Sequence, residues 1–355
     1  MGDIKTKKKV LFFVGSGVGG AERMTIRIAK FLDLSEFIPI FVIVGKQKGN
    51  ITDFIPKNYG IEYIHIRNIY DFTTLRLLNL MRKESPNVVF CSSTYLSVRV
   101  IMAAHILGNI KIIVRSPNSF ASFPKSIQCL VKLTYKYTDV IIAQQEEMRQ
   151  EFLSCLKLLE NKIVTLQNPI DTDFIDSHIK VESPYKDNNQ TKYLWVGRFD
   201  YTKGQDILVK AFKKVKETKL NAHLYLVGKY NKDSSFYKDV ETFVNNNNLT
   251  DSVHFVGYDD NPYRWVKYCD CFVQPSRLEG LPNALIEAMY LQKPVAATEC
   301  IPIINRIIKD GYNGYVVPSE DISSLSDAMI KALNLSNFTM TYKPASQEDF
   351  VELFS

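Results

Sequence analysis

The chain has 355 residues, 46% of them hydrophobic and 23% charged, which is enough for about two globular domains that each bury a core. Its longest apolar runs are the size of β-strands and fall far short of the roughly 20 residues that a membrane-spanning helix needs. A net charge of +6 favours anionic partners, such as nucleotide phosphates, anionic lipids or nucleic acid, without choosing among them.

The cysteine and histidine patterns argue against a metal centre. The six cysteines lack CxxC spacing and the five histidines form no HExxH motif, so we expect free thiols and no bound metal. The basic segment 1–9 leads directly into a strand, without the apolar core and cleavage site of a signal peptide. We therefore expect a cytoplasmic protein.

Two series of short runs rich in Val, Ile and Phe follow one another along the chain. The first comprises residues 10–14, 39–44, 62–66, 88–91, 110–114, 140–143 and 163–166. The second comprises residues 193–196, 224–227, 253–256, 271–274, 295–298 and 315–317. Helix-like segments separate most of these runs, an alternation that predicts parallel sheets with helices on both faces. The fold class is therefore α/β, with two Rossmann-like, doubly wound domains.

A polar stretch between the two series has the composition of a linker. Residues 183–190 include Pro184, Asn188 and Asn189, which are typical of irregular connections. We place the boundary near residue 185, with an N-terminal domain over 1–185 and a C-terminal domain over 186–355.

A glycine-rich loop follows the first strand. Gly15, Gly17, Gly19 and Gly20 fit a GxGxxG pattern before a helix expected over 21–32, and backbone amides at such a helix start can cradle an anion. A dinucleotide site also needs an acid about 20 residues further on, but the second strand ends in Val-Gly-Lys-Gln-Lys. A tight turn without a ligand remains an alternative. We favour a loop that faces a phosphate or an acceptor across an interdomain cleft.

Two cations follow the strand at 193–196. Arg198 and Lys203 share one loop and are bracketed by Gly197 and Gly204. In an open α/β sheet the ligand lies beyond the carboxyl ends of the strands, so this loop brings both charges to the ligand edge. The planar fork of Arg and the compact charge of Lys suit a departing nucleoside diphosphate. A solvated basic loop is the alternative interpretation.

Two acids follow the strand at 271–274. Glu279 lies on the loop, and Pro282 suits the first turn of a helix that we expect to begin near Asn283. Glu287 then falls one turn into that helix, on the same face as Asn283. A carboxylate there can accept hydrogen bonds from two ribose hydroxyls, while helix amides meet phosphate and Glu279 reaches sugar hydroxyls. Otherwise two acids at this spacing are an ordinary surface pair.

These residues resemble family 4 of the glycosyltransferases, which are retaining, metal-independent enzymes of the GT-B fold that use nucleotide sugars. The motifs that carry the resemblance are Gly19-Gly20-Ala-Glu22-Arg23, Asn168-Pro-Ile-Asp171, Val196-Gly-Arg198 with Lys203-Gly204, the EX7E pair Glu279 and Glu287, and Asp310-Gly-Tyr-Asn-Gly314. The resemblance implies two Rossmann-like domains that face a cleft, the first binding the acceptor and the second the nucleotide sugar. A short C-terminal helix is expected to cross back onto the first domain.

Carried over by position, the resemblance makes Arg198, Lys203 and Glu279 the catalytic residues. The implied donor-binding residues are Gly19, Gly20, Arg198, Lys203, Gly280, Leu281, Asn283, Ala284, Leu285 and Glu287. The nucleoside-diphosphate sugar is the substrate, and neither a cofactor nor a metal is expected. In this family the leaving diphosphate is thought to help deprotonate the incoming hydroxyl, so the protein contributes positioning and electrostatics.

Three features depart from the family pattern. Many members place a histidine after an N-domain strand, but here that loop reads Arg115-Ser-Pro-Asn118, so Arg115 and Asn118 are the acceptor-side candidates. Segment 301–310 has Ile, Asn and Arg306 where the family usually has Gly and Glu, which predicts altered contacts and reduced activity. Only a helix over 346–354 is left for the usual crossover.

The expected reaction moves a hexosyl or N-acetylhexosaminyl group, with UDP as the favoured nucleotide, to a glycan or a polyprenyl-diphosphate-linked saccharide in surface polysaccharide assembly. Interleaved Phe, Leu and Lys residues over 115–137 are compatible with peripheral contact at the inner face of the cell membrane, and equally with an ordinary packed helix. No nucleic-acid-binding module is recognisable. A nucleotide-sugar 2-epimerase and a non-catalytic nucleotide-sugar-binding protein are the alternatives.

Overall fold

The computed structural model describes residues 6–17, 19–45, 50–66, 73–157, 160–187, 189–336 and 339–355. Outside them lie several residues considered above, namely residues 1–5 of the basic segment, Val18, Lys46, Gln47, Lys48 and Asn188. The chain forms two compact units, one of Met1–Pro169 with Pro344–Ser355 and one of Ile170–Lys343. Among the described helices, none is both long enough and apolar enough to cross a bilayer.

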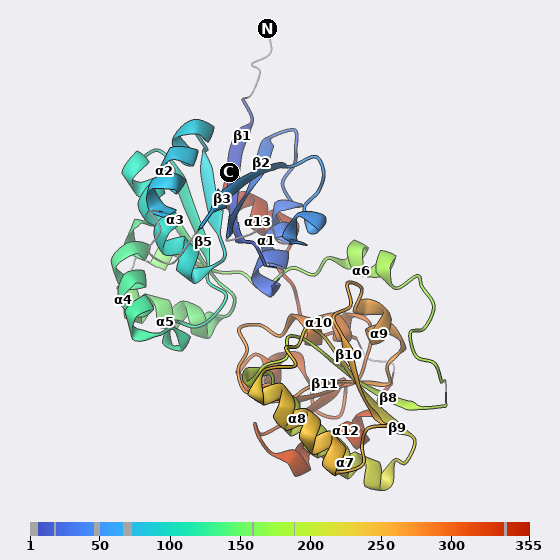
Figure 1. Ribbon diagram of the computed structural model, residues 1–355. Helices are drawn as coiled ribbons and strands as arrows, with labels where there is room; N and C mark the ends of the chain where they lie inside the picture. The colour runs from blue at the N-terminus through green and yellow to red at the C-terminus, as the bar shows by residue number, and fades with distance from the viewer. Residues whose placement is uncertain are drawn as a thin grey trace. The chain divides into compact units, whose positions relative to one another are not determined.

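Within the described residues, the first unit is built on a seven-stranded parallel sheet in the order β3-β2-β1-β4-β5-β6-β7 (Figure 1). Its strands are β1 (Lys8–Gly15), β2 (Phe37–Gly45), β3 (Gly60–His65), β4 (Val88–Cys91), β5 (Lys111–Arg115), β6 (Val140–Ala143) and β7 (Ile163–Thr165). Leu11 and Phe13 of β1 pack in one core cluster, whereas Val10 and Phe12 pack in another. The unbroken apolar runs of the sequence are thus strands buried on both faces.

The second unit repeats this design. Its described part contains a six-stranded parallel sheet in the order β10-β9-β8-β11-β12-β13. The strands are β8 (Thr191–Val196), β9 (Ala222–Val227), β10 (Val253–Gly257), β11 (Cys271–Gln274), β12 (Val295–Thr298) and β13 (Gly314–Val317). All of them include the runs expected from the sequence, because the apolar runs that identify a buried parallel strand are local features.

Helices cover both sheets. Those of the first unit are α1 (Gly20–Ala29), α2 (Thr73–Glu84), α3 (Thr94–Leu107), α4 (Lys125–Thr134), α5 (Glu146–Leu156) and α13 (Gln347–Phe354). Those of the second unit are α6 (Thr172–His178), α7 (Gln205–Thr218), α8 (Ser235–Asn246), α9 (Tyr263–Tyr268), α10 (Asn283–Tyr290), α11 (Ile304–Ile307) and α12 (Ile322–Ala332). In α7 the buried Leu208, Ala211, Phe212 and Val215 recur at helical spacing, so one face of the helix lies on the core.

The strand order reverses direction once in each sheet. In the first unit the reversal lies between β1 and β4, and in the second it lies between β8 and β11. Ligands of doubly wound domains bind beyond the carboxyl ends of the strands at such a switch point, because the flanking loops diverge there. The loops that follow β8 and β11 carry Arg198, Lys203 and Glu279, so all three residues belong to this edge of the second sheet.

The division between the units falls after Pro169, ahead of the position near residue 185 that composition suggested. The intervening segment packs on the second unit. Tyr185 is 5% exposed, its ring lies 5.1 Å from the Trp265 ring, and its hydroxyl donates to the Trp265 carbonyl at 2.8 Å. The same stretch contributes the fully buried Ile175, and its Ile179 carbonyl accepts from Lys267 Nζ at 2.9 Å. Buried and hydrogen-bonded residues thus hold on the second unit a stretch whose composition is that of a linker.

The last helix belongs to the first unit. A capping box starts α13: the Ser346 hydroxyl accepts from the Asp349 amide at 3.2 Å, and the Asp349 carboxylate accepts from the Ser346 amide at 2.7 Å. Phe354 is fully buried, with its ring 5.7 Å from that of Phe12 and 5.8 Å from that of Phe90. In Figure 1 the red α13 lies beside the blue β1. The helix therefore completes a core formed by residues from the start of the chain.

We expect Phe354→Ala to destabilise the protein by about 3–5 kcal/mol, the usual loss for removing a buried phenyl ring. Urea unfolding measures the change. Leu75→Ala is the matched control, because Leu75 is a 55% exposed apolar residue of the same unit. A loss no larger than that of the control would contradict the role of α13 in the core.

Candidate active site

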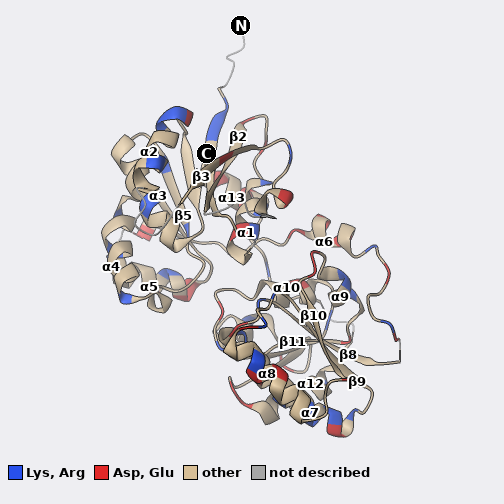
Figure 2. Ribbon diagram, in the orientation of Figure 1, with Lys and Arg blue, Asp and Glu red and all other residues tan. Residues whose placement is uncertain are grey.

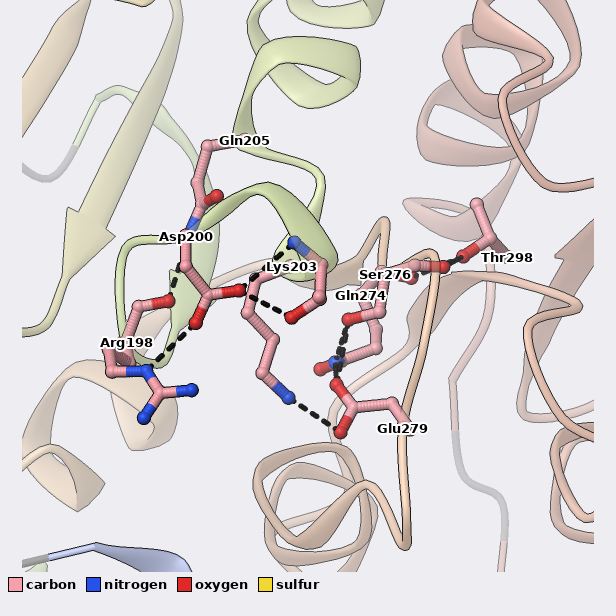
Figure 3. A network of polar contacts seen from close by, with 9 residues as sticks. Arg198, Asp200, Lys203, Gln205, Gln274, Ser276, Glu279 and Thr298 are labelled. Atoms are coloured by element: carbon pink, nitrogen blue, oxygen red, sulfur yellow. Dashed lines mark hydrogen bonds and ion pairs between the residues drawn. The ribbon is translucent and has the colours of Figure 1, made fainter. Parts of the chain in front are cut away.

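An ion pair joins the two loops at the switch point of the second unit. Lys203 Nζ lies 2.7 Å from Glu279 Oε2, and the two side chains are 23% and 7% exposed. The other oxygen of Glu279 accepts hydrogen bonds from Gln274 Nε2 at 2.6 Å and Ser276 Oγ at 2.7 Å. Figure 3 shows Lys203 reaching the carboxylate from the neighbouring loop. Three donors thus hold Glu279 in one orientation.

The end of a third strand supports this network. Thr298, the last residue of β12, is fully buried and donates from Oγ1 to the Ser276 carbonyl at 2.6 Å. Gln274, the last residue of β11, also donates to Ser276 Oγ at 2.7 Å. Polar side chains at the carboxyl ends of two adjacent strands therefore fix the loop that carries Glu279, in agreement with the general position of ligand sites in such sheets.

Arg198 lies between β8 and the 3₁₀ turn η5 (Tyr201–Lys203). Its side chain is 77% exposed, and Nε donates to Asp200 Oδ2 at 2.8 Å. Asp200 also caps η5, because its Oδ1 accepts from the Thr202 amide at 3.0 Å. Burial raises the pKa of Asp200, but hydrogen bonds from Thr202 and the charge of Arg198 outweigh it and leave that pKa below its ordinary value. The charged Asp200 thus anchors an Arg198 guanidinium that remains accessible.

Gly204 permits the two loops to touch. It adopts φ of +71°, and a Cβ at this position would lie 2.0 Å from the Pro275 carbonyl oxygen. Both the left-handed backbone and the close approach exclude other residues. The adjoining Gln205 is fully buried and donates from Nε2 to the Arg198 carbonyl at 3.1 Å. The loop after β8 is therefore fixed by its close contact with Pro275 and by the hydrogen bond from Gln205.

Arg277 is a further site residue, which the sequence does not single out. Its guanidinium contacts both oxygens of Asp206 at 2.8 Å, donates to the Tyr201 carbonyl at 2.8 Å and lies 3.9 Å from the centroid of the Tyr201 ring. It also pairs with Glu320 at 2.6 Å. Hydrogen bonding to Asp206 is the main cause that raises the pKa of Arg277 above its ordinary value. Arg277 thereby clamps the loop after β11 to η5 and α7, but its partners lie too far along the chain for a local pattern to reveal it.

Helix α10 begins at Asn283, as predicted, with Pro282 at the N-cap rather than in the first turn. Asn283 and Glu287 are both half-buried. The Tyr263 hydroxyl lies 3.5 Å from Glu287 Oε1, at the limit of a hydrogen bond. Glu287 therefore lies one turn into α10, where the Tyr263 hydroxyl approaches its carboxylate.

Two of the predicted donor-binding residues are core residues. Leu281 and Leu285 are 6% and 0% exposed and pack in the second unit's hydrophobic core. Ala284 is partly buried against the same core, and Gly280 is half-buried on the loop. At Leu281 and Leu285 only main-chain groups are therefore available to a ligand.

The atypical segment 301–310 is explained by packing. Ile303, Ile304, Ile307 and Ile308 are all at most 3% exposed, so the isoleucines contribute to the core of the second unit. Asn305 donates to Glu299 Oε1 at 2.5 Å. An open hollow beside this contact is lined by Glu299, Asn305, Ile308, Lys309, Asp310, Val316, Val317 and Pro318.

The site candidates of the first unit, Arg115, Asn118 and the glycine loop, differ from one another in burial. Arg115 is 3% exposed and donates to Ser92 Oγ at 2.9 Å and to Asn168 Oδ1. It therefore ties the end of β5 to the segments after β4 and β7. The Asn118 side chain is exposed. Gly19 is the N-cap of α1 and the next residue is its first helical position, so the glycine loop lies at a helix start as predicted.

Comparisons with known proteins identify the family. The model of Glycosyltransferase Family 4 matches residues 18–174, and that of Glycosyl transferases group 1 matches residues 176–349. An uncharacterised glycosyltransferase of Methanocaldococcus jannaschii is 30% identical over 243 residues, which are 64% of this chain and 59% of that relative, so less than two thirds of the relative is spanned. The Escherichia coli protein UDP-Gal:alpha-D-GlcNAc-diphosphoundecaprenol alpha-1,3-galactosyltransferase is 23% identical over 336 residues, covering 88% of this chain and 84% of its own.

Solved structures agree with this result at the level of the fold. HepE of Anabaena, in complex with UDP and glucose, matches with a TM-score of 0.77 at 16% identity, covering 92% of this chain and 90% of HepE. The two parallel-sheet units are those of the GT-B fold. The chain therefore belongs to the glycosyltransferases, with a family 4 domain followed by a group 1 domain.

Proposed function

We propose that this protein is a retaining glycosyltransferase that moves a hexosyl or N-acetylhexosaminyl group from a nucleoside-diphosphate sugar to a hydroxyl. The observation that carries the proposal is the Lys203–Glu279 ion pair at the switch point of a group 1 domain, on the edge where the exposed Arg198 also lies. This edge of the sheet supplies two cationic groups for a diphosphate and one fixed carboxylate for a sugar.

Each donor-binding residue is proposed to contact a different part of the nucleotide sugar. Arg198 and Lys203 bind the diphosphate, Glu279 the transferred sugar and Glu287 the ribose. UDP is the favoured nucleotide, because the name of the Escherichia coli relative specifies UDP-Gal and the HepE structure contains UDP. Glu279 already accepts three hydrogen bonds of about four that a carboxylate can accept. It therefore has room for one sugar hydroxyl in a fixed direction.

Catalysis rests on positioning and charge. As the bond between the anomeric carbon and the diphosphate breaks, negative charge accumulates on the leaving oxygen, and two preorganised cations stabilise it. We propose that Arg198 and Lys203 provide this charge without a metal cofactor. The oxygen of the incoming hydroxyl then bonds to the anomeric carbon on the face from which the diphosphate leaves, and the departing diphosphate takes the hydroxyl proton. Attack on that face retains the anomeric configuration.

We propose a lipid-linked saccharide as the acceptor and α4 as the surface that contacts the membrane. The Escherichia coli relative is named for a diphosphoundecaprenol-linked acceptor. On α4, Leu130 and Leu133 are 43% and 56% exposed. Lys132 of the same helix and Lys136 of the adjoining 3₁₀ turn η3 (Tyr135–Tyr137) are exposed as well, and Figure 2 shows basic positions on the ribbon in this region. Exposed leucines interleaved with lysines suit an anionic membrane surface, where the protein would act from the cytoplasmic side.

Replacing the diphosphate ligands should slow transfer. We expect Arg198→Ala and Lys203→Ala each to lower kcat on the order of 100-fold, the usual cost of one preorganised donor. The assay follows UDP release and product formation with a panel of UDP-sugars and lipid-linked saccharides. Arg198→Ala is the cleaner variant, because its guanidinium is exposed, whereas Lys203→Ala also removes a partner of Glu279.

Lys238→Ala, on the exposed face of α8, is the matched control and should leave the rate unchanged. Near-normal turnover in both site variants would refute the assignment. Nucleotide-sugar binding by the wild type without any transfer would favour the non-catalytic alternative, and conversion of the donor without an acceptor would favour the epimerase. A product of inverted anomeric configuration would exclude the retaining mechanism.

Glu287 is expected to act on nucleotide affinity. Glu287→Ala should weaken UDP binding by roughly 1–3 kcal/mol, because a charge-assisted hydrogen bond to ribose is lost. Calorimetric titration with UDP measures this. Glu241→Ala is the control, because Glu241 also accepts from a tyrosine hydroxyl, that of Tyr237 at 2.8 Å, but lies on α8. Equal affinities for the two variants would count against the ribose contact.

The α4 surface should bind anionic membranes. We expect the wild type to float with liposomes that contain anionic lipid, and the double variant Lys132→Glu/Lys136→Glu to lose most of this binding, because electrostatic attraction is replaced by repulsion. The control Lys210→Glu/Lys213→Glu makes the same charge change on exposed positions of α7. Flotation that is absent in the wild type, or equally reduced in both variants, would rule out α4 as the contact surface.

A further inference from the structure

Arg277 holds the turn that carries Lys203. Its guanidinium donates to the Tyr201 carbonyl at 2.8 Å and lies 3.9 Å from the centroid of the Tyr201 ring. The main chain adds to this contact, because the amides of Arg277 and Leu278 both donate to the Thr202 carbonyl, at 2.8 and 3.2 Å. Tyr201 and Thr202 are the first two residues of η5, and Lys203 is the third. The turn that ends at Lys203 is therefore bound to the loop after β11 through Arg277.

Two carboxylates fix the other side of this guanidinium. Nη1 and Nη2 pair with the two oxygens of Asp206 in the first turn of α7, each at 2.8 Å, and Nε pairs with Glu320, which follows β13, at 2.6 Å. A planar guanidinium that makes all these bonds at once has one orientation. The side chain is only 15% exposed, so water competes little for its partners. Arg277 thus connects the segments that follow β8, β11 and β13.

The place of Lys203 depends on this clamp more than that of Glu279 does. Glu279 receives hydrogen bonds from Gln274 Nε2 and Ser276 Oγ, which belong to its own strand and loop. Lys203 reaches the carboxylate from η5, and its Nζ lies 2.7 Å from Glu279 Oε2 (Figure 3). The distance between the two charged groups is therefore set by how η5 lies on the loop after β11, where Arg277 acts.

We propose that Arg277 is a positioning residue for sugar transfer, because it holds η5 where Lys203 can stabilise the leaving diphosphate. This inference rests on the proposed function, since it deepens the role assigned to Lys203. Arg277 acts through Lys203 and is assigned no contact with the substrate. Misplacing a catalytic group by about 1 Å can cost on the order of 100-fold in rate. Lysine cannot replace Arg277, because a single ammonium does not reproduce the planar fork that binds two carboxylates and a carbonyl.

Arg277→Lys keeps the charge and loses the fork. We expect it to lower kcat by roughly 10- to 100-fold, measured by UDP release and product formation. In the Lys203→Ala background the same substitution should lower kcat by no more than about threefold, because the group that Arg277 positions is already absent. A purely structural role would lower the rate independently of Lys203, so equal fold-losses in the two backgrounds would overturn the inference.

A second variant and a matched control accompany this comparison. Asp206→Asn removes a charge from the clamp and should also lower kcat, by a smaller factor than Arg277→Lys. The control is Arg149→Lys in the first unit, because Arg149 likewise pairs with a carboxylate, that of Glu146 at 3.1 Å, and donates to a main-chain carbonyl, that of Ile163 at 3.0 Å. Full activity in Arg277→Lys, or an equal loss in Arg149→Lys, would contradict the positioning role.

Hydrogen exchange tests the clamp without turnover. The amides of Lys203 and Leu278 are hydrogen-bonded within this junction, and in Arg277→Lys they should exchange about tenfold faster or more, because the turn opens more often. Arg149→Lys should leave them unchanged, and Asp206→Asn carries both measurements if Arg277→Lys does not fold. Unchanged exchange in the clamp variants would overturn the inference. Failure of the proposed function differs: the wild type then transfers no sugar from any UDP-sugar, whereas exchange at these amides still responds to the loss of the clamp.

Discussion

The reversal of strand order at the centre of each sheet is the constraint on which the rest of the structure depends. Two adjacent parallel strands end side by side there, and their following helices diverge to opposite faces. In the second unit this brings together the loops after β8 and β11, so that Lys203 Nζ and Glu279 Oε2 lie 2.7 Å apart although they are distant in sequence. In the first unit the Glu22 carboxylate lies near Gly15, the last residue of β1.

A buried carboxylate at such an edge needs hydrogen-bond donors from the protein. Glu279 is only 7% exposed, and a carboxylate with so little water must be compensated by donors from the protein. Lys203, Gln274 and Ser276 supply them, while Arg277 holds the loops in register by its contacts with Asp206. The guanidinium of Arg198 stays exposed, so it is accessible to the diphosphate that we propose as its ligand. The edge thus combines one fixed carboxylate with one accessible cation.

Much of this could be predicted from local patterns. The strands, the helix that begins at Asn283 and the glycine turn before α1 are set by apolar runs, periodicity and turn chemistry within short windows. The sequence predicted that Lys203 and Glu279 lie at the same edge of the sheet, but not that they form an ion pair. Arg277 was beyond reach because its partners come from other segments. The domain boundary lies earlier than composition suggested because segment 170–185 contributes buried residues, Ile175 and Tyr185 among them, to the second unit.

By itself the sequence determined the two doubly wound domains, the strand ends that carry the charged residues and the family to which the chain belongs, because each of these depends on residues close together or on motifs in fixed order. Only the tertiary structure decided which side chains meet. It buried Arg115 among three strand ends, turned the isoleucines of segment 301–310 into core, and folded Glu22 over Gly19. The reason is that hydrogen bonds and steric fit between distant segments depend on distances of a few ångströms, which no local pattern encodes.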